Sequence, residues 1–266
     1  MNRKIIFLDC DGTLFDVPRG MEEVSKYTRY AVNELIKNGH LVFIASGRSK
    51  CFMPDHVKEL NPSGFVTCNG GYACFKDKEI YSIKVKQESL DALIDYCNKH
   101  DGVFYLETQD FIYTKDTSVS LHKRFLVQWG DVKDAFTDSK QSKHYNCMMC
   151  AFKTEQDCLD FEKAFNGVFD YRRQVGFTSY DLFDFGIHKG FAVKKVLEYF
   201  NISKEDAYAF GDGLNDIEMF SEVKESYAVE NGDDKVKALA KHICPDVLDD
   251  GFYQAMVWEG LIKAVD

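Results

Sequence analysis

The sequence lacks the features that would place the protein in a membrane or on a nucleic acid. None of its apolar runs approaches the length needed to span a bilayer. Arg3 and Lys4 precede only four apolar residues, too few for a signal peptide. Positive charge is not in excess, because the formal net charge is -10 at pH 7, whereas a general nucleic-acid binder should be basic. We therefore expect neither a membrane nor a nucleic acid among the partners.

The sequence also lacks a disulfide framework, internal repeats and low-complexity segments. Its 9 cysteines are odd in number and scattered, which is typical of a reducing compartment and predicts a cytoplasmic protein. Cys147 and Cys150 form a Cys-x-x-Cys, but no second pair accompanies them. They lie in an apolar run that ends at Phe152, so a structural strand is favoured there over a metal or redox site.

Strands and helices alternate at both ends of the chain. Short apolar runs read as strands, and apolar residues at helical spacing separate them. Such alternation predicts a parallel sheet with helices on its faces. The expected strands are residues 5–8, 41–45, 65–67, 207–210 and 227–229.

The middle of the chain has a different character. Between about residues 83 and 184, hairpin-like strand pairs mix with three helical stripes, less regularly than in the first third. We read this segment as a separate α+β domain inserted into a discontinuous core domain made of residues 1–82 and 185–266. The predicted fold class is α/β, a Rossmann-like parallel-sheet core with an inserted α+β domain.

Two carboxylates follow the first predicted strand, Ile5–Leu8. Asp9 and Asp11 are one residue apart, so in an extended chain their side chains point the same way. Like charges placed together repel unless a cation lies between them, and Mg²⁺ binds to carboxylates and substrate phosphate. The alternative is an Asp-rich turn that ends a strand and has no further role.

Other strand ends carry complementary polar residues. Ser46 follows the second strand, Lys189 opens a helix, and Asp212, Asn215 and Asp216 follow a late strand. In an open parallel sheet these ends form one site. The set suits phosphoryl transfer, with a carboxylate nucleophile, a second carboxylate as acid and base, a metal, and a lysine that offsets negative charge.

These residues resemble a known family. Four segments resemble the motifs of the haloacid dehalogenase-like hydrolases: Asp9-x-Asp11-Gly12-Thr13, Ser46-Gly47-Arg48, Lys189-Gly190 and Gly211-Asp212-x-x-Asn215-Asp216. The inserted segment and the Asn69-Gly70 turn resemble the Cof-type subfamily of sugar-phosphate phosphatases, which carry a large α/β cap. The resemblance covers nearly the whole chain.

The resemblance implies a role for each motif residue. Asp9 would be the nucleophile and Asp11 the general acid and base. Mg²⁺ would be held by the Asp9 carboxylate, the Asp11 backbone carbonyl and Asp212. The remaining implied roles are phosphoryl binding by Ser46, Gly47, Lys189 and Asn215, orientation of Lys189 or a metal-bound water by Asp216, and a substrate contact or supporting salt bridge by Arg48.

The expected function is magnesium-dependent hydrolysis of phosphate monoesters of small metabolites, above all sugar phosphates, through an aspartyl-phosphate. The partner is a small phosphorylated metabolite, and the protein is a monomer or small homo-oligomer. Candidate specificity residues of the cap are Arg124, Arg172 and Arg173, with a solvated surface role as the alternative. A phosphomutase is the alternative enzyme. A non-catalytic phosphometabolite-binding protein should lack one of the motif residues, and none is missing here.

Overall fold

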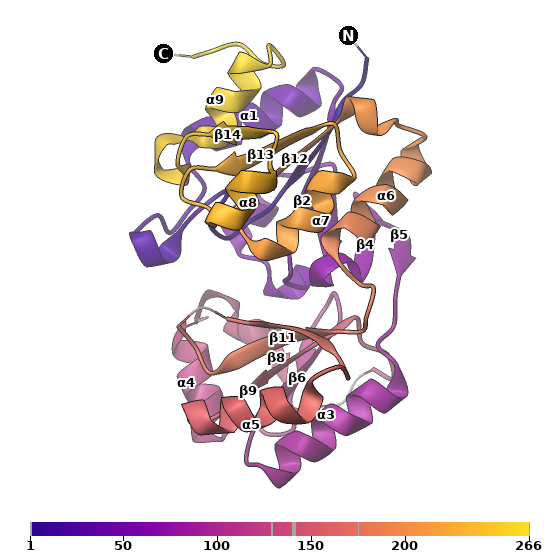
Figure 1. The fold of residues 1–266 in the computed structure, drawn as a ribbon, viewed down its shortest axis with the longest axis vertical. Helices are drawn as coiled ribbons and strands as arrows, with labels where there is room; N and C mark the ends of the chain where they lie inside the picture. The colour runs from indigo at the N-terminus through magenta and orange to yellow at the C-terminus, as the bar shows by residue number, and fades with distance from the viewer. Residues whose placement is uncertain (1, 129, 140–141, 175, 266) are drawn as a thin grey trace. The chain divides into compact units, whose positions relative to one another are not determined.

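The computed structural model describes residues 2–128, 130–139, 142–174 and 176–265. Their contacts divide the chain into two compact units, drawn in Figure 1. The core unit comprises Met1–Ser46, Asp55–Tyr81 and His188–Asp266, and the inserted unit comprises Gly47–Pro54 and Ser82–Ile187. The segment 47–54 thus packs with the inserted unit, whereas the sequence predicts it in the core domain. The predicted assignment of residues 83–184 as an inserted domain stays a prediction.

The core unit is built on one sheet, which among the described residues has the strand order β14-β13-β12-β1-β2-β3-β4-β5. The strands from β14 to β3 run parallel, and β4 is antiparallel to β3. Leu8 at the end of β1 is in register with Phe210 of β12 and Ile44 of β2, so three carboxyl ends lie side by side. The bounds are β1 Ile5–Leu8, β2 Leu41–Ala45, β3 Gly64–Thr67, β4 Tyr72–Phe75, β5 Lys78–Ser82, β12 Ala207–Gly211, β13 Glu225–Val229 and β14 His242–Cys244.

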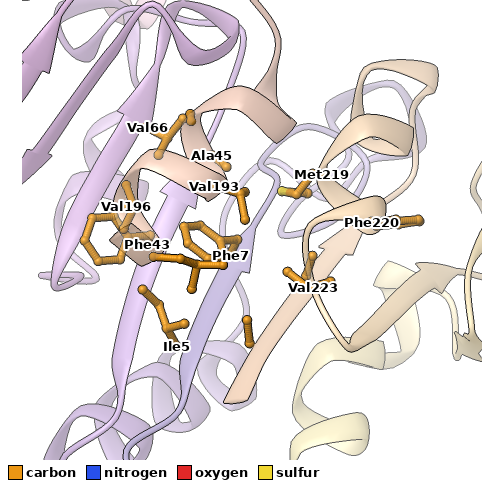
Figure 2. Close-up of a cluster of buried hydrophobic side chains, with 14 of the residues drawn as sticks. Ile5, Phe7, Phe43, Ala45, Val66, Val193, Val196, Met219, Phe220 and Val223 are labelled. Carbon is orange, nitrogen blue, oxygen red and sulfur yellow. The ribbon is translucent and has the colours of Figure 1, made fainter. Parts of the chain in front are cut away.

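Apolar side chains of helices and strands meet in the core of this unit. Figure 2 shows Val193 and Val196 of α6 packed against Phe7 and Phe43 of β1 and β2, whose ring centroids are 5.7 Å apart. Burial of these apolar surfaces holds α6 on the sheet. The helices of the unit are α1 Lys26–Lys37, α2 Asp55–Lys58, α6 Lys189–Phe200, α7 Ile217–Ser221, α8 Asp234–Leu239 and α9 Gly251–Trp258, with 3-10 turns η1 Val17–Arg19, η3 Cys68–Gly70, η5 Lys204–Asp206, η6 Leu214–Asp216 and η7 Val247–Asp249.

The inserted unit has its own sheet, of order β10-β11-β9-β6-β7-β8 among the described residues. Its strands are antiparallel except for the pair β7 and β8. Cys147 and Cys150 are buried in β9, in the strand that the sequence predicts. The elements are β6 Val103–Glu107, β7 Ile112–Tyr113, β8 Phe136–Thr137, β9 Cys147–Ala151, β10 Asp170–Arg173, β11 Ser179–Phe183, α3 Gln87–Lys99, α4 Ser120–Gln128, α5 Glu155–Phe165, η2 Lys50–Phe52 and η4 Gly130–Ala135.

The predicted α/β class is confirmed, with a largely parallel sheet in the core unit. Within the described part of the chain, every helix is too short or too polar to cross a bilayer.

Candidate active site

The polar residues of the candidate site are placed by the ends of neighbouring elements in the core unit. Asp9 follows β1, and its backbone amide donates to the carbonyl of Phe210 in β12 at 3.0 Å. Lys189 is the first residue of α6, and His188 caps this helix by accepting a hydrogen bond from the amide of Phe191 at 3.1 Å. The sheet and one helix start therefore bring residues 9, 189 and 212 to one edge.

A buried lysine joins two carboxylates at this edge. The Lys189 ammonium donates to Asp9 Oδ1 and, at 2.6 Å, to Asp216 Oδ1. Lys189 and Asp216 are fully buried, and Asp9 is only 6% exposed. One carboxylate oxygen each from Asp9, Asp212 and Asp216 lies within 4.8 Å of the other two. Acidic groups from opposite ends of the chain thus form one cluster.

Asp216 is held from several directions. Its Oδ2 accepts the backbone amides of Asp212 and Gly213, both at 3.0 Å, while Oδ1 accepts from Lys189. A Cβ at Gly211 would lie 2.4 Å from the Asp216 carboxylate, so only glycine allows this approach. Because both Asp216 oxygens already have partners, its geometry suits orientation of Lys189 better than direct ligation of a metal.

Asp212 faces the loop that follows Asp9. The Thr13 hydroxyl donates to Asp212 Oδ1 at 3.2 Å. Gly12 has a φ of 82°, and a Cβ there would lie 2.2 Å from Asp212 Oδ2. A side chain at position 12 would therefore collide with the carboxylate, which explains why the Asp9 loop needs glycine at this point.

Burial and charge perturb the site's pKa values. Burial raises the pKa of Asp9 to about 7, although the Lys189 ammonium lowers it, and neighbouring Asp216 and Asp11 raise it further. Burial also raises the pKa of Asp212 well above its ordinary value, and the charges of Asp9 and Asp216 add to this. Burial lowers the pKa of Lys189, but the carboxylates of Asp216 and Asp9 raise it by more, so its net pKa lies above the usual range and the ammonium stays charged.

The donor set fits a hard divalent cation. The cluster holds three carboxylates and one ammonium, which pairs with two of them, so negative charge is in excess. Oxygen ligands are those that Mg²⁺ prefers. A cation would remove the mutual repulsion that raises the pKa values of Asp9 and Asp212.

The other predicted core residues lie as follows. Asp11 is exposed, two residues beyond buried Asp9. Ser46 is buried directly after β2, and its carbonyl accepts from the amide of Asn69 at 3.0 Å. Asn215 is half-buried in η6, between Asp212 and Asp216. All three belong to the core unit, as does the acidic cluster.

Gly47 and Arg48 belong to the inserted unit. The Arg48 guanidinium donates to the carbonyl of Phe52 at 3.3 Å and lies 5.2 Å from the centre of its ring. The structure therefore gives Arg48 a local partner, and its contact with substrate stays a prediction.

The three candidate arginines of the inserted unit are engaged within that unit. Their guanidinium groups contact a backbone carbonyl or a carboxylate, so their charge is already used in structural contacts. The partners are Phe152 O at 2.9 Å for Arg124, Asp170 at 2.6 Å for Arg172, and Glu155 at 2.7 Å through one nitrogen of Arg173. Their role in specificity stays a prediction.

Sequence reasoning missed Asn231, which lies two residues after β13. Its amide nitrogen donates to the carbonyl of Gly12 at 2.7 Å. The sequence could have indicated it, because Asn231 and Gly232 form an Asn-Gly pair just beyond the predicted strand 227–229. Asp9 and Asp212 likewise follow predicted strands of the same sheet.

Comparison with known proteins decides the family. The model of the haloacid dehalogenase-like hydrolase family matches residues 6–256. The chain is a haloacid dehalogenase-like hydrolase. The family indicated by the four motifs is thereby confirmed, and with it the prediction of an enzyme.

Relatives of this hydrolase extend over its whole length. "Putative phosphatase YkrA" of Bacillus subtilis is 31% identical over 99% of this chain and 100% of its own length. A phosphoglycolate phosphatase of Archaeoglobus fulgidus is 28% identical, with 98% of each chain covered. The crystal structure of a hypothetical protein from Geobacillus kaustophilus has a TM-score of 0.85 at 27% identity, covering 98% of this chain and 100% of that one.

Proposed function

We propose that this hydrolase removes phosphate from monoesters of small metabolites, sugar phosphates among them, with Mg²⁺ and through an aspartyl-phosphate. One observation carries the proposal: the carboxylates of Asp9, Asp212 and Asp216 converge within 4.8 Å, with the buried Lys189 bonded to two of them. This arrangement combines a nucleophile, a cation site and fixed positive charge.

The relatives support the type of reaction. Two of those named above carry phosphatase in their names, and they match this chain from end to end. Only one of the two names states a substrate, phosphoglycolate, so the substrate of this enzyme is left to experiment.

Asp9 is the proposed nucleophile. Its Oδ1 is held by Lys189, which fixes the carboxylate and leaves Oδ2 to attack phosphorus. As the new bond between Asp9 and phosphorus forms, the bond from phosphorus to the ester oxygen breaks, and Asp11 gives its proton to the departing alcohol. Asp11 then takes a proton from water, whose oxygen attacks phosphorus and releases inorganic phosphate and free Asp9.

The remaining residues would stabilise charge. When bound by Asp9, Asp212 and the Asp11 backbone carbonyl, Mg²⁺ would neutralise phosphoryl charge. Lys189 supplies a second positive charge from within the protein, and Asp216 orients it. The phosphoryl oxygens would be bound by the hydroxyl of Ser46, the backbone amide of Gly47 and the side-chain amide of Asn215.

A phosphate-release screen over phosphorylated metabolites tests the proposal. We expect release with Mg²⁺, none with a chelator, and none from Asp9→Asn even though that variant still binds a phosphate analogue. Asp206→Asn is the matched control, because Asp206 also pairs with a lysine, Lys4 at 2.5 Å, and has no role in the proposed chemistry. It should keep wild-type turnover.

The outcomes separate the candidate functions. Wild-type turnover in Asp9→Asn would overturn the covalent mechanism. An isomeric sugar phosphate without free phosphate would identify a phosphomutase. Binding of phosphorylated metabolites with no product of either kind would identify a binding protein and refute the proposal.

A further inference from the structure

The Asn231 side chain joins the loop after β1 to the start of η7. Its Nδ2 donates to the carbonyl of Gly12 at 2.7 Å, and its Oδ1 accepts the backbone amide of Val247 at 3.0 Å. The side chain is half-buried, and both ends of its amide have partners. A single side chain therefore fixes the loop that carries Asp9 and Asp11 to the β13 side of the sheet.

The residues after Asn231 contact the backbone of Asp212. The amide of Asp233 donates to the carbonyl of Asp212 at 2.9 Å. The backbone of Gly232 is close enough that a Cβ there would lie 3.0 Å from Asp212 Cα. On its other side, the Asp212 carboxylate contacts Gly12, where a Cβ would lie 2.2 Å away. Asp212 is thus held between Gly12 and residues 232–233.

These contacts form a closed ring. It runs from Gly12 to Asp212, on to residues 232 and 233, and returns to Gly12 through the Asn231 side chain. In such a ring the length of the Asn231 side chain sets the separation between the Asp9 loop and Asp212. Ligands of a small cation tolerate little displacement, since Mg²⁺ demands near-ideal geometry.

We propose that Asn231 is a positioning residue that sets the spacing of the Asp9 and Asp212 carboxylates for the cation. The inference rests on the proposed function in one respect, namely that this cluster binds Mg²⁺. It assigns Asn231 no contact with substrate or cation.

The test measures cation affinity without substrate. Titration of the full-length protein with Mn²⁺ or Mg²⁺ in a calorimeter compares the wild type with Asn231→Ala and Asn231→Gln, which shorten and lengthen the side chain. Loss of residues that orient metal ligands typically weakens metal binding about 10- to 100-fold. We expect a weakening in that range for both variants, with a corresponding rise in the Mg²⁺ concentration needed for turnover.

Asn38→Ala is the matched control. Asn38 is also in the core unit and makes the same kind of bond, from Nδ2 to the carbonyl of Leu261 at 3.0 Å, with no link to the cluster. It should lower the melting temperature but leave cation affinity unchanged. If Asn231→Ala does not fold, Asn231→Leu keeps the side-chain size without adding charge, and it should weaken cation binding because it removes the donor to Gly12.

Wild-type cation affinity in a folded Asn231→Ala or Asn231→Leu protein would overturn the inference. An equal weakening in Asn38→Ala would also overturn it, because the effect would then be one of general stability. Both results are independent of turnover. Failure of the wild type to release phosphate would refute the proposed function and leave the cation titration to decide the role of Asn231.

Discussion

Replacing Lys189 tests how the buried charges of the site are balanced. Lys189→Met keeps the length and apolar stem of the side chain but removes the ammonium that bonds Asp9 and Asp216. All three side chains are nearly or fully buried, so water cannot replace the lost partner. Removing one member of a buried ion pair typically costs about 3–5 kcal/mol. We expect a loss of that size in the free energy of unfolding.

Urea unfolding near pH 7 in the presence of a chelator measures this loss. Without Lys189 the pKa of Asp9 rises further, because the ammonium that lowers it is gone, so Asp9 takes up a proton more readily in the folded protein. The variant should therefore lose less stability at lower pH, where Asp9 is neutral. The double variant Lys189→Met/Asp216→Asn should regain part of the loss, because it removes one of the two unpaired charges.

A loss below about 1 kcal/mol for Lys189→Met would refute this reasoning, since it is the value expected of an exposed pair. Turnover provides a second reading. Lys189→Met should lower kcat by at least about 10²-fold, because fixed positive charge at the reacting phosphoryl group is removed.

Three further changes are predicted. Gly70→Ala should lower kcat more than about 10-fold, because a Cβ there would lie 2.4 Å from the carbonyl oxygen of His188, next to the lysine that starts α6. Gly39→Ala is the control, since Gly39 has a φ of 86° and no atom near the position of a Cβ. It should lose only about 1 kcal/mol of stability and no activity in the same assays. Burial raises the pKa of Glu107 to about 7, from its ordinary value of 4.5. As pH rises from 4.5 to about 7, the unfolded chain loses this proton while the folded protein keeps it. The free energy of unfolding should therefore fall over this range, by up to about 3 kcal/mol. Glu107→Gln should remove that fall in urea unfolding at several pH values, and an unchanged pH profile would contradict the assignment. Asp11→Asn should lower kcat about 10²- to 10⁴-fold on alkyl phosphates. The loss should be much smaller on aryl phosphates, because their leaving group needs no proton. An equal loss on both kinds of substrate would exclude Asp11 as the general acid.

The positions of the acidic residues could be predicted because they depend on backbone topology. A parallel sheet brings the carboxyl ends of its strands together, so a motif after the first strand and one after a late strand had to meet. Asp9 and Asp212 are accordingly in one cluster, although about 200 residues separate them in the sequence. Lys189 could be placed for the same reason, since it opens the helix that packs on this sheet.

The partners of individual side chains could not be predicted, because they depend on distances that the sequence does not contain. His188 is a helix cap, and no periodicity identifies the atom to which an imidazole will bond. Arg173 pairs with Glu155, 18 residues away, so its charge did not reveal its role. The segment 47–54 packs with the inserted unit because the backbone amides of Ser49 and Lys50 donate hydrogen bonds to the side chains of Glu107 and Gln109. Such contacts between short polar segments leave no periodic pattern in the sequence.

In the proposed site, carboxylates from opposite ends of the chain share one cation. Anomalous diffraction from crystals soaked in Mn²⁺ shows whether they do, because the signal locates the ion independently of the protein atoms. We expect one strong peak within about 2.0–2.4 Å of a carboxylate oxygen of both Asp9 and Asp212. A peak bound to only one of them, or an ion held elsewhere while these carboxylates stay apart, would contradict it.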